Sequence, residues 1–264
     1  YMRNMVYLNT GTNRFMEVAY LSGLATTDWT WTVKFGDLDN DGFEDVYFTN
    51  GMSRDFMNGD AKDRFRSQKN KLIDNFNFWN SQEPYRLNNM AFKNLGNLKF
   101  KDVSLDWGLD HFGVSTGSAM GDLDNDGDLD LVMNGFDEPV RLYRNNTEEN
   151  NSIRLNLEGE EANKKGLGAK VEMLLNNNET KLLRYVSSSR GLMSSSESTI
   201  HFGLGAEDKA DEIKIYWPSG KVQSLKDIPS GHLYTISEKS NSKKKNQKKE
   251  PMFARRFNSL SATK

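Results

Sequence analysis

The sequence contains two copies of one acidic decapeptide, and this duplication constrains the fold more than any other feature. The copies span 36–45 and 121–130, and both read GDLDNDG followed by two residues and Asp. Counted from the first Asp, carboxylates recur at positions one, three, five and nine. Carboxylates held within about 4 to 5 Å repel one another by about 1 to 4 kcal/mol per pair. A cation bound among them would remove that repulsion.

Calcium is the cation that fits these ligands best. It takes many oxygen ligands in flexible geometry, whereas magnesium requires a stricter octahedron and retains its waters. We therefore predict two calcium sites, each built from four Asp side chains and the backbone carbonyl at position seven. The predicted ligands are Asp37, Asp39, Asp41, Phe43 and Asp45 in the first loop, and Asp122, Asp124, Asp126, Asp128 and Asp130 in the second. The alternative is an Asp-rich turn without metal, held by local hydrogen bonds.

The residues that flank the loops indicate strands. Both loops begin like an EF-hand, but position twelve is Phe48 in one copy and Met133 in the other, where an EF-hand has Glu. The flanking residues 33–35, 46–48 and 131–133 are rich in β-branched and aromatic side chains. Each loop is therefore expected to join two strands.

The acidic loops belong to a longer internal repeat. Residues 1–51 and 86–136 align at a constant offset of 85. Each copy predicts four short antiparallel strands, a pattern typical of a propeller blade, and residues 137–146 predict the opening strand of another unit. Because a blade cannot bury both of its faces alone, we expect further blades in the parent chain and interpret this sequence as a fragment.

Residues 52–85 form an insertion between the two copies. Four apolar residues have helical spacing: Phe65, Leu72, Ile73 and Phe76. They predict one helix, with Asn58 or Asp60 to cap its start. The helix is expected to pack over the propeller rim. The alternative is a partner-binding surface made by four aromatic residues: Phe76, Phe78, Trp79 and Tyr85.

The chain is predicted to divide at residue 150. Residues 1–150 form the blades, and residues 151–238 contain alternating strands that predict a smaller β domain. Residues 239–264 are interpreted as a basic linker or tail. Nine Lys or Arg and one Glu give the tail a charge of +8, which leaves −10 on residues 1–238. Because the basic run has no interleaved aromatic residues, we expect no nucleic-acid partner.

Composition excludes several other classes. The chain has no Cys, so disulfides, thiolate metal sites and Cys nucleophiles are absent. No apolar run is long enough to insert into a membrane, and no signal peptide is visible in this sequence. Residues 113–117 match the G-x-S-x-G nucleophile motif, but they lead into the acidic loop and lack the helix that this motif requires. We therefore assign no catalytic residue.

The acidic loops resemble FG-GAP or VCBS repeats, the calcium-binding blades of integrin-α-like propellers. Four later segments resemble the ASPIC/UnbV domain that follows such repeats in secreted proteins of the cartilage acidic protein type: 166–171, 190–191, 201–205 and 217–220. The resemblance implies an all-β fold, in which a partial β-propeller with one helical insertion precedes a small β domain.

The resemblance also implies a function. We expect a non-catalytic, calcium-binding module, extracellular or on the cell surface, that binds a protein or glycan ligand. The alternative is an accessory or catalytic component of polysaccharide processing, with its site in the insertion or at the propeller mouth.

Overall fold

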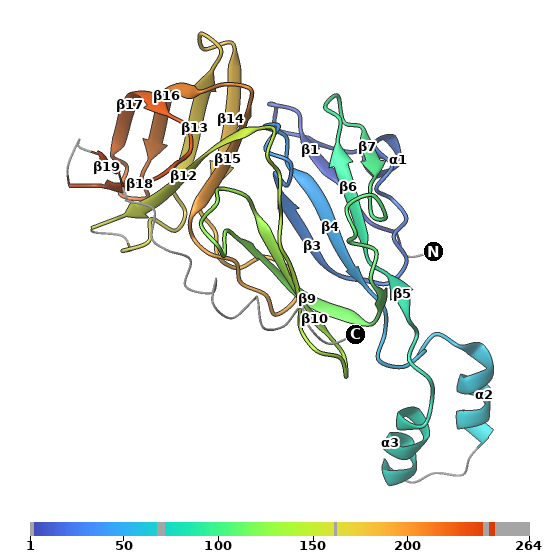
Figure 1. Ribbon diagram of the computed structural model, residues 1–264. Helices are drawn as coiled ribbons and strands as arrows, with labels where there is room; N and C mark the ends of the chain where they lie inside the picture. The colour runs from blue at the N-terminus through green and yellow to red at the C-terminus, as the bar shows by residue number, and fades with distance from the viewer. Residues whose placement is uncertain (1–2, 68–71, 161–162, 240–242, 246–264) are drawn as a thin grey trace.

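The computed structural model describes residues 3–67, 72–160, 163–239 and 243–245. Strands dominate, and they form several separate sheets, so the fold is all-β as the sequence predicts. The repeat sheets and the sheets of the C-terminal domain lie side by side (Figure 1). Among the described residues, none of the helices has the length and apolar character needed to cross a membrane.

The described residues of the repeat region form four sheets, all antiparallel. Two of them are short pairs, β1 (Tyr7–Asn9) with β2 (Phe15–Glu17) and β5 (Leu87–Asn88) with β8 (Phe112–Gly113). A four-stranded sheet has the order β3 (Thr30–Gly36), β4 (Asp45–Asn50), β6 (Met90–Asn94) and β7 (Phe100–Asp102). A three-stranded sheet has the order β9 (Ser115–Gly121), β10 (Asp130–Gly135) and β11 (Arg141–Tyr143). Helix α1 (Ala19–Ser22) follows β2.

The four-stranded sheet does not correspond to one copy of the repeat, and this corrects the sequence-based blade boundary. Strands β3 and β4 come from the first copy, whereas β6 and β7 come from the second. Val46 of β4 lies opposite Phe92 of β6, and both side chains are buried in one apolar cluster. Every residue of β4 is buried, so the hairpin that carries the acidic loop needs a partner on its second edge. The following copy supplies it.

The second acidic hairpin acquires its partner in the same way. Strand β11 pairs with β10, with Leu131 opposite Tyr143. The strand predicted within residues 137–146 is therefore confirmed. Each acidic loop thus joins two strands of a sheet whose next strand comes from the following unit.

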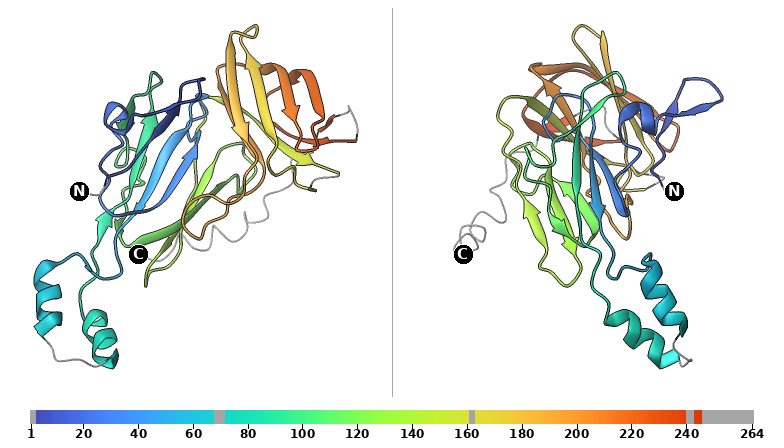
Figure 2. Two further views of the ribbon diagram at one scale, coloured as in Figure 1. Left: turned by 180° about the vertical axis from the view of Figure 1, so that it is seen from behind. Right: turned by 90° about the vertical axis from the view of Figure 1, so that its right-hand side faces the viewer.

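The insertion forms two helices, where the sequence predicted one. They are α2 (Gly59–Ser67) and α3 (Leu72–Asn80). Asn58 caps α2, since its Oδ1 accepts the N–H of Ala61 at 3.0 Å. The helices project away from the sheets and do not pack over the rim (Figure 2). Phe65 and Phe78 pack against Trp79 with ring centroids 5.7 and 5.2 Å away, so the hairpin has a small aromatic core of its own.

The C-terminal domain is a sandwich of two four-stranded sheets around one apolar core. One sheet has the order β15 (Ile200–Gly205), β12 (Asn151–Glu158), β18 (His232–Ser237) and β19 (Lys243–Lys245). The other has the order β14 (Thr180–Tyr185), β13 (Lys170–Leu175), β16 (Lys209–Tyr216) and β17 (Val222–Pro229). The segment interpreted from the sequence as a linker or tail contains strand β19. This strand pairs with the edge of β18 and so belongs to the C-terminal domain.

Candidate metal centres

Both acidic loops are hairpin turns with the same backbone conformation. The first joins β3 to β4, and the second joins β9 to β10. Position four is Asn40 or Asn125, with φ near 59° and 62°, and position six is Gly42 or Gly127, with φ of 97° and 112°. Asn tolerates the left-handed conformation better than most side chains, and Gly has no side chain to clash. The sequence GDLDNDG therefore fixes one loop shape twice.

The two carboxylate oxygens of the first Asp in each loop have different surroundings. Oδ2 of Asp37 accepts the N–H of Gly42 at 2.9 Å, and Oδ2 of Asp122 accepts the N–H of Gly127 at 3.0 Å. Within the described part of the chain, Oδ1 of both residues is buried and has no hydrogen-bond partner. Oδ1 of Asp39 is likewise buried and has no hydrogen-bond partner among the described residues. Buried carboxylate oxygens without a partner are costly, and these oxygens are free to accept a cation.

The predicted side-chain ligands gather in two groups, each with its ligand atoms within 4.8 Å of one another. They are Asp37, Asp39 and Asp45 in the first loop, and Asp122, Asp124 and Asp126 in the second. Asp41 and Asp130 lie outside these close groups. At position seven, Phe43 is half exposed and donates its N–H to Asp41, whereas the Asp128 side chain is buried and accepts a 2.7 Å hydrogen bond from Asn40. The two loops are therefore in direct contact.

Position nine has a role that spacing alone does not reveal. The two oxygens of Asp45 accept the N–H groups of Leu38, at 2.9 Å, and Asn94, at 2.8 Å. The second loop repeats this arrangement, because Asp130 accepts from Leu123 and Asn145, both at 2.8 Å. Position nine therefore closes each loop and anchors it to the next strand of the sheet.

A basic side chain at the end of that next strand, or directly after it, approaches each loop. Nζ of Lys93 contacts Asp39 and lies 3.2 Å from Oδ2 of Asp41. Arg144 holds the second loop in the same way, with distances of 2.6 Å to Asp124 and 3.3 Å to Asp126. Each basic residue directly precedes the Asn that binds position nine. Sequence reasoning missed both residues, although a base before the Asn that follows each acidic loop was the available signal.

Burial raises the pKa of the first and the last Asp of each loop. It raises the pKa of Asp37 to about 7, although the charge of Arg184 lowers this pKa. It raises the pKa of Asp45 to about 8, although the hydrogen bonds from the N–H groups of Asn94 and Leu38 lower it. In the second loop, burial raises the pKa of Asp122 and of Asp130 to about 6. The ionised loops are therefore unfavourable without a counter-charge.

Without metal, the protein is expected to lose stability as the pH rises from about 4 to about 8. The folded-state pKa values of Asp37 and Asp45 lie above the value of about 3.9 for an unfolded Asp, so the stabilisation is complete below that value. Above it, the stabilisation falls by up to about 1.4 kcal/mol per pH unit for each carboxyl, and the loss is complete once the pH has passed about 7 for Asp37 and about 8 for Asp45. Thermal unfolding in chelator checks this. A midpoint that rises over the same window contradicts it, and Asp37→Asn should flatten the slope.

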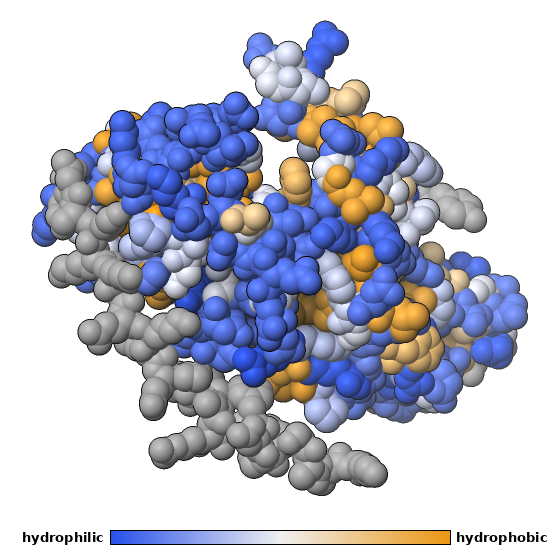
Figure 3. Space-filling model, turned by 45° about the horizontal axis from the view of Figure 1, so that its top comes forward, coloured by the Kyte–Doolittle hydropathy of each residue, from blue (hydrophilic) through white to orange (hydrophobic). Residues whose placement is uncertain are grey.

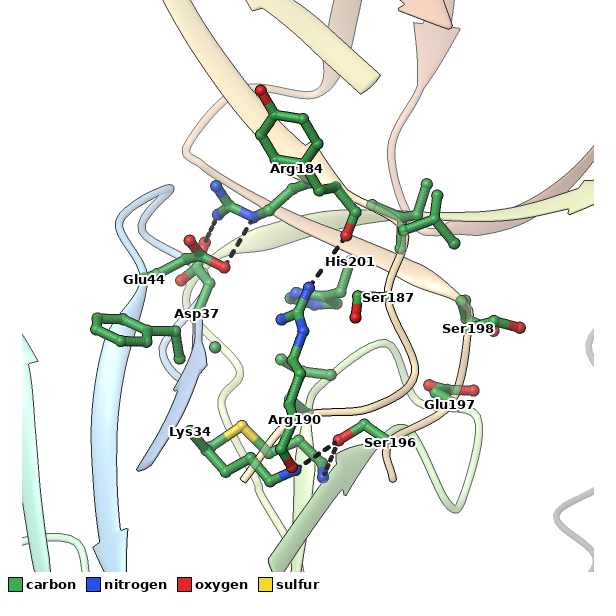
Figure 4. Close-up of a pocket in the computed structure, with 18 residues that line it drawn as sticks. Lys34, Asp37, Glu44, Arg184, Ser187, Arg190, Ser196, Glu197, Ser198 and His201 are labelled. Atoms are coloured by element: carbon green, nitrogen blue, oxygen red, sulfur yellow. Dashed lines mark hydrogen bonds and ion pairs between the residues drawn. The ribbon is translucent and has the colours of Figure 1, made fainter. Parts of the chain in front are cut away.

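A cavity of about 70 Å³ lies where the first loop meets the C-terminal domain. Figure 4 shows Arg184 extended towards Asp37 and Glu44, with distances of 4.0 and 3.5 Å. Lys34 is buried and donates to the carbonyl oxygen of Arg190 at 2.6 Å, and burial lowers its pKa to about 8. His201 is buried with Nε2 3.1 Å from the carbonyl oxygen of Gly127, a structural hydrogen bond.

A larger surface groove of about 910 Å³ lies beside the start of β3. The rings of Trp29 and Trp31 meet edge to face in its wall, 6.1 Å apart, and Trp31 is 38% exposed. Asp28 and Tyr85 also line the groove, and their side chains are hydrogen-bonded at 3.2 Å. The tryptophans are thus partly accessible from the groove.

Two family models match this chain, and together they define its class. Residues 1–48 match the FG-GAP-like repeat, and residues 159–243 match the domain described as ASPIC and UnbV. The chain therefore combines an FG-GAP-like repeat with an ASPIC and UnbV domain, which confirms the resemblance seen in the sequence.

Relatives with curated descriptions are cartilage acidic protein 1 from three vertebrates. The human protein is 26% identical over 266 residues, the mouse protein 25% over 266 residues, and the Xenopus tropicalis protein 27% over 265 residues. These alignments cover 89%, 89% and 88% of this chain, but only 40%, 41% and 40% of the relatives. The chain thus spans about two fifths of their length.

Proposed function

We propose that this chain is a non-catalytic calcium-binding module of an extracellular or cell-surface protein. One observation carries the proposal: in both loops, the first Asp keeps a buried oxygen without a hydrogen-bond partner among the described residues, beside two further carboxylates. Calcium accepts such oxygen ligands, and extracellular fluid would supply it. The ions would neutralise the loops and tie together neighbouring strands.

We further propose that the repeat sheets are blades of a larger propeller. Strands β6 and β11 each pair with the acidic hairpin of the preceding unit, but the equivalent strand β1 pairs only with β2 among the described strands. Several apolar side chains near this edge are exposed: Met5, Tyr7, Phe15, Met16 and Tyr20. Figure 3 shows more apolar, orange surface on the repeat side, at the right, than on the C-terminal sandwich. Further blades of the parent chain would cover this edge.

The module is proposed to present a surface to a protein or glycan ligand. The groove beside Trp29 and Trp31 supports this, because it combines aromatic rings with polar side chains such as Asp28 and Asn88. Aromatic rings supply contact area, and the polar groups supply hydrogen bonds.

Polysaccharide processing is a second candidate function, favoured by two carboxylates in the same groove. Asp28 and Asp55 both line it, and both raise the pKa of Tyr85, although burial has the larger effect. Paired carboxylates are the usual catalysts of glycoside hydrolysis. If the chain releases reducing sugar from a polysaccharide and Asp28→Asn abolishes the release, the chain is an enzyme and the non-catalytic proposal fails.

Calorimetric titration with calcium tests the metal proposal directly. The wild-type chain is expected to bind two ions, each of the variants Asp39→Ala and Asp124→Ala one, and the double variant none. Asp208→Ala serves as the control, because this Asp is exposed and lies outside both loops. Two ions bound by the double variant would place calcium elsewhere and contradict the proposal.

A further inference from the structure

The C-terminal domain is docked directly on both acidic loops. The N–H of Gly203 donates to Oδ2 of Asp37 at 3.1 Å, and the N–H of Gly205 donates to the carbonyl oxygen of Asn40 at 2.8 Å. The second loop is held by Arg154, whose guanidinium contacts Oδ2 of Asp122. All these donors belong to β12 and β15, adjacent strands of one sheet. One sheet therefore reaches both loops.

The contacted oxygen is the same in both loops. Asp37 and Asp122 each present Oδ2 to the C-terminal domain, while the buried Oδ1 has no hydrogen-bond partner in the described structure. A carboxylate is rigid, so holding Oδ2 fixes the direction of Oδ1. In both copies of the repeat, the C-terminal domain therefore holds Oδ2 of the first Asp. The donor is a backbone N–H in the first loop and a guanidinium in the second.

The fit at the first loop leaves no space for a side chain at position 203. A Cβ on Gly203 would lie 2.3 Å from Oδ2 of Asp37 and 2.5 Å from the Cα of Asn40. Real Cβ atoms essentially never approach other atoms so closely. The backbone of the loop would have to shift to make room, and such a shift is costly in a closely packed interior. Gly203 therefore permits the contact by which its N–H holds Asp37.

We propose that Gly203 and Arg154 are positioning residues of the two cation sites, so that cation binding and docking of the C-terminal domain are linked. The proposal rests on the calcium-binding function proposed above. Residues that orient metal ligands through hydrogen bonds commonly change metal affinity by about 10 to 100-fold when they are replaced. Linkage is reciprocal, so a bound cation strengthens docking by the same factor by which docking strengthens binding.

Calcium titration of single-site proteins tests the proposal. Asp124→Ala leaves only the first site, and Asp39→Ala leaves only the second. Gly203→Ala is expected to weaken the first site by about 10-fold or more and to leave the second unchanged. Arg154→Gln is expected to do the reverse. Each variant is thus the control for the other, because a chain that had merely failed to fold would lose both sites.

Each result has one interpretation. If Arg154→Gln tightens the second site, Arg154 is a competing cation and its positioning role is wrong. If neither variant changes the affinity of its own loop while the wild type binds two ions, the inference fails and the calcium function stands. If the wild type binds no calcium, the proposed function itself fails. Gly59→Ala is a further control, since nothing lies within 4 Å of a Cβ at that position.

Amide hydrogen exchange measures the reciprocal effect. Calcium is expected to slow exchange at Gly203 and Gly205 by about 10-fold or more, because both N–H groups donate to the first loop. In the Asp39→Ala variant, calcium should no longer slow amide exchange at these two glycines. Equal exchange rates with calcium and with chelator, in a wild-type protein that binds two ions, would show that docking is independent of the cation and overturn the linkage.

Discussion

Saturating calcium is expected to raise the unfolding midpoint of this protein by about 10 to 20 °C. An ion that binds only the folded state adds about 2.7 kcal/mol when its free concentration is a hundredfold above Kd. One kcal/mol shifts the midpoint of a chain of this size by about 2 to 4 °C, and there are two sites. The shift is large because the metal-free loops hold carboxyls at positions where burial disfavours their ionised forms.

The matched measurement uses magnesium, chelator and the double variant Asp39→Ala, Asp124→Ala. Magnesium should give a smaller shift, since it retains its waters and requires octahedral geometry. The double variant should unfold at the same temperature with calcium and with chelator. If the folded wild type does not respond to calcium, the loops are turns held by hydrogen bonds and the metal proposal is wrong.

The loops and their flanking strands could be predicted because their signals are local. GDLDNDG fixes the turn through Asn and Gly at defined positions, and β-branched and aromatic neighbours indicate strands on both sides. The second copy repeats every signal at a constant offset. Local pattern also gave Asn58 as one of two candidate caps, although the single apolar stripe across α2 and α3 did not reveal that they form two helices.

The remaining features of the site depend on contacts between residues far apart in sequence. Asp45 binds Asn94 across 49 residues, and Asp37 binds Gly203 across 166 residues. Periodicity reports which residues share a face, but it contains no information about which edge pairs with which strand. For this reason the sheets that join two repeat copies, and the docking of the C-terminal domain on the loops, emerge only from the structure.

Asp45→Asn is expected to destabilise the protein by about 2 to 4 kcal/mol even in chelator. The side chain of Asp45 is fully buried, and its two oxygens accept the N–H groups of Leu38 and Asn94. An amide of the same shape would turn its NH₂ group towards one of these donors. That donor would lose its acceptor, and the strand β6 would lose an anchor to the loop. Urea unfolding of the metal-free protein measures the change.

Two further variants separate anchoring from ligation. Asp130→Asn should cost a similar amount, because Asp130 makes the equivalent bonds to Leu123 and Asn145. Asp39→Asn should remove the calcium response of the first site. It should change the metal-free stability by less than about 1 kcal/mol, because the contact that it weakens is a partly exposed ion pair with Lys93. If Asp45→Asn is neutral in chelator and abolishes only the response to calcium, position nine acts as a metal ligand and does not anchor β6. Equal losses from Asp45→Asn and Asp39→Asn in chelator would also contradict the proposal, since Asp45 links the loop to β6 through a buried backbone hydrogen bond and Asp39 only through a partly exposed ion pair with Lys93.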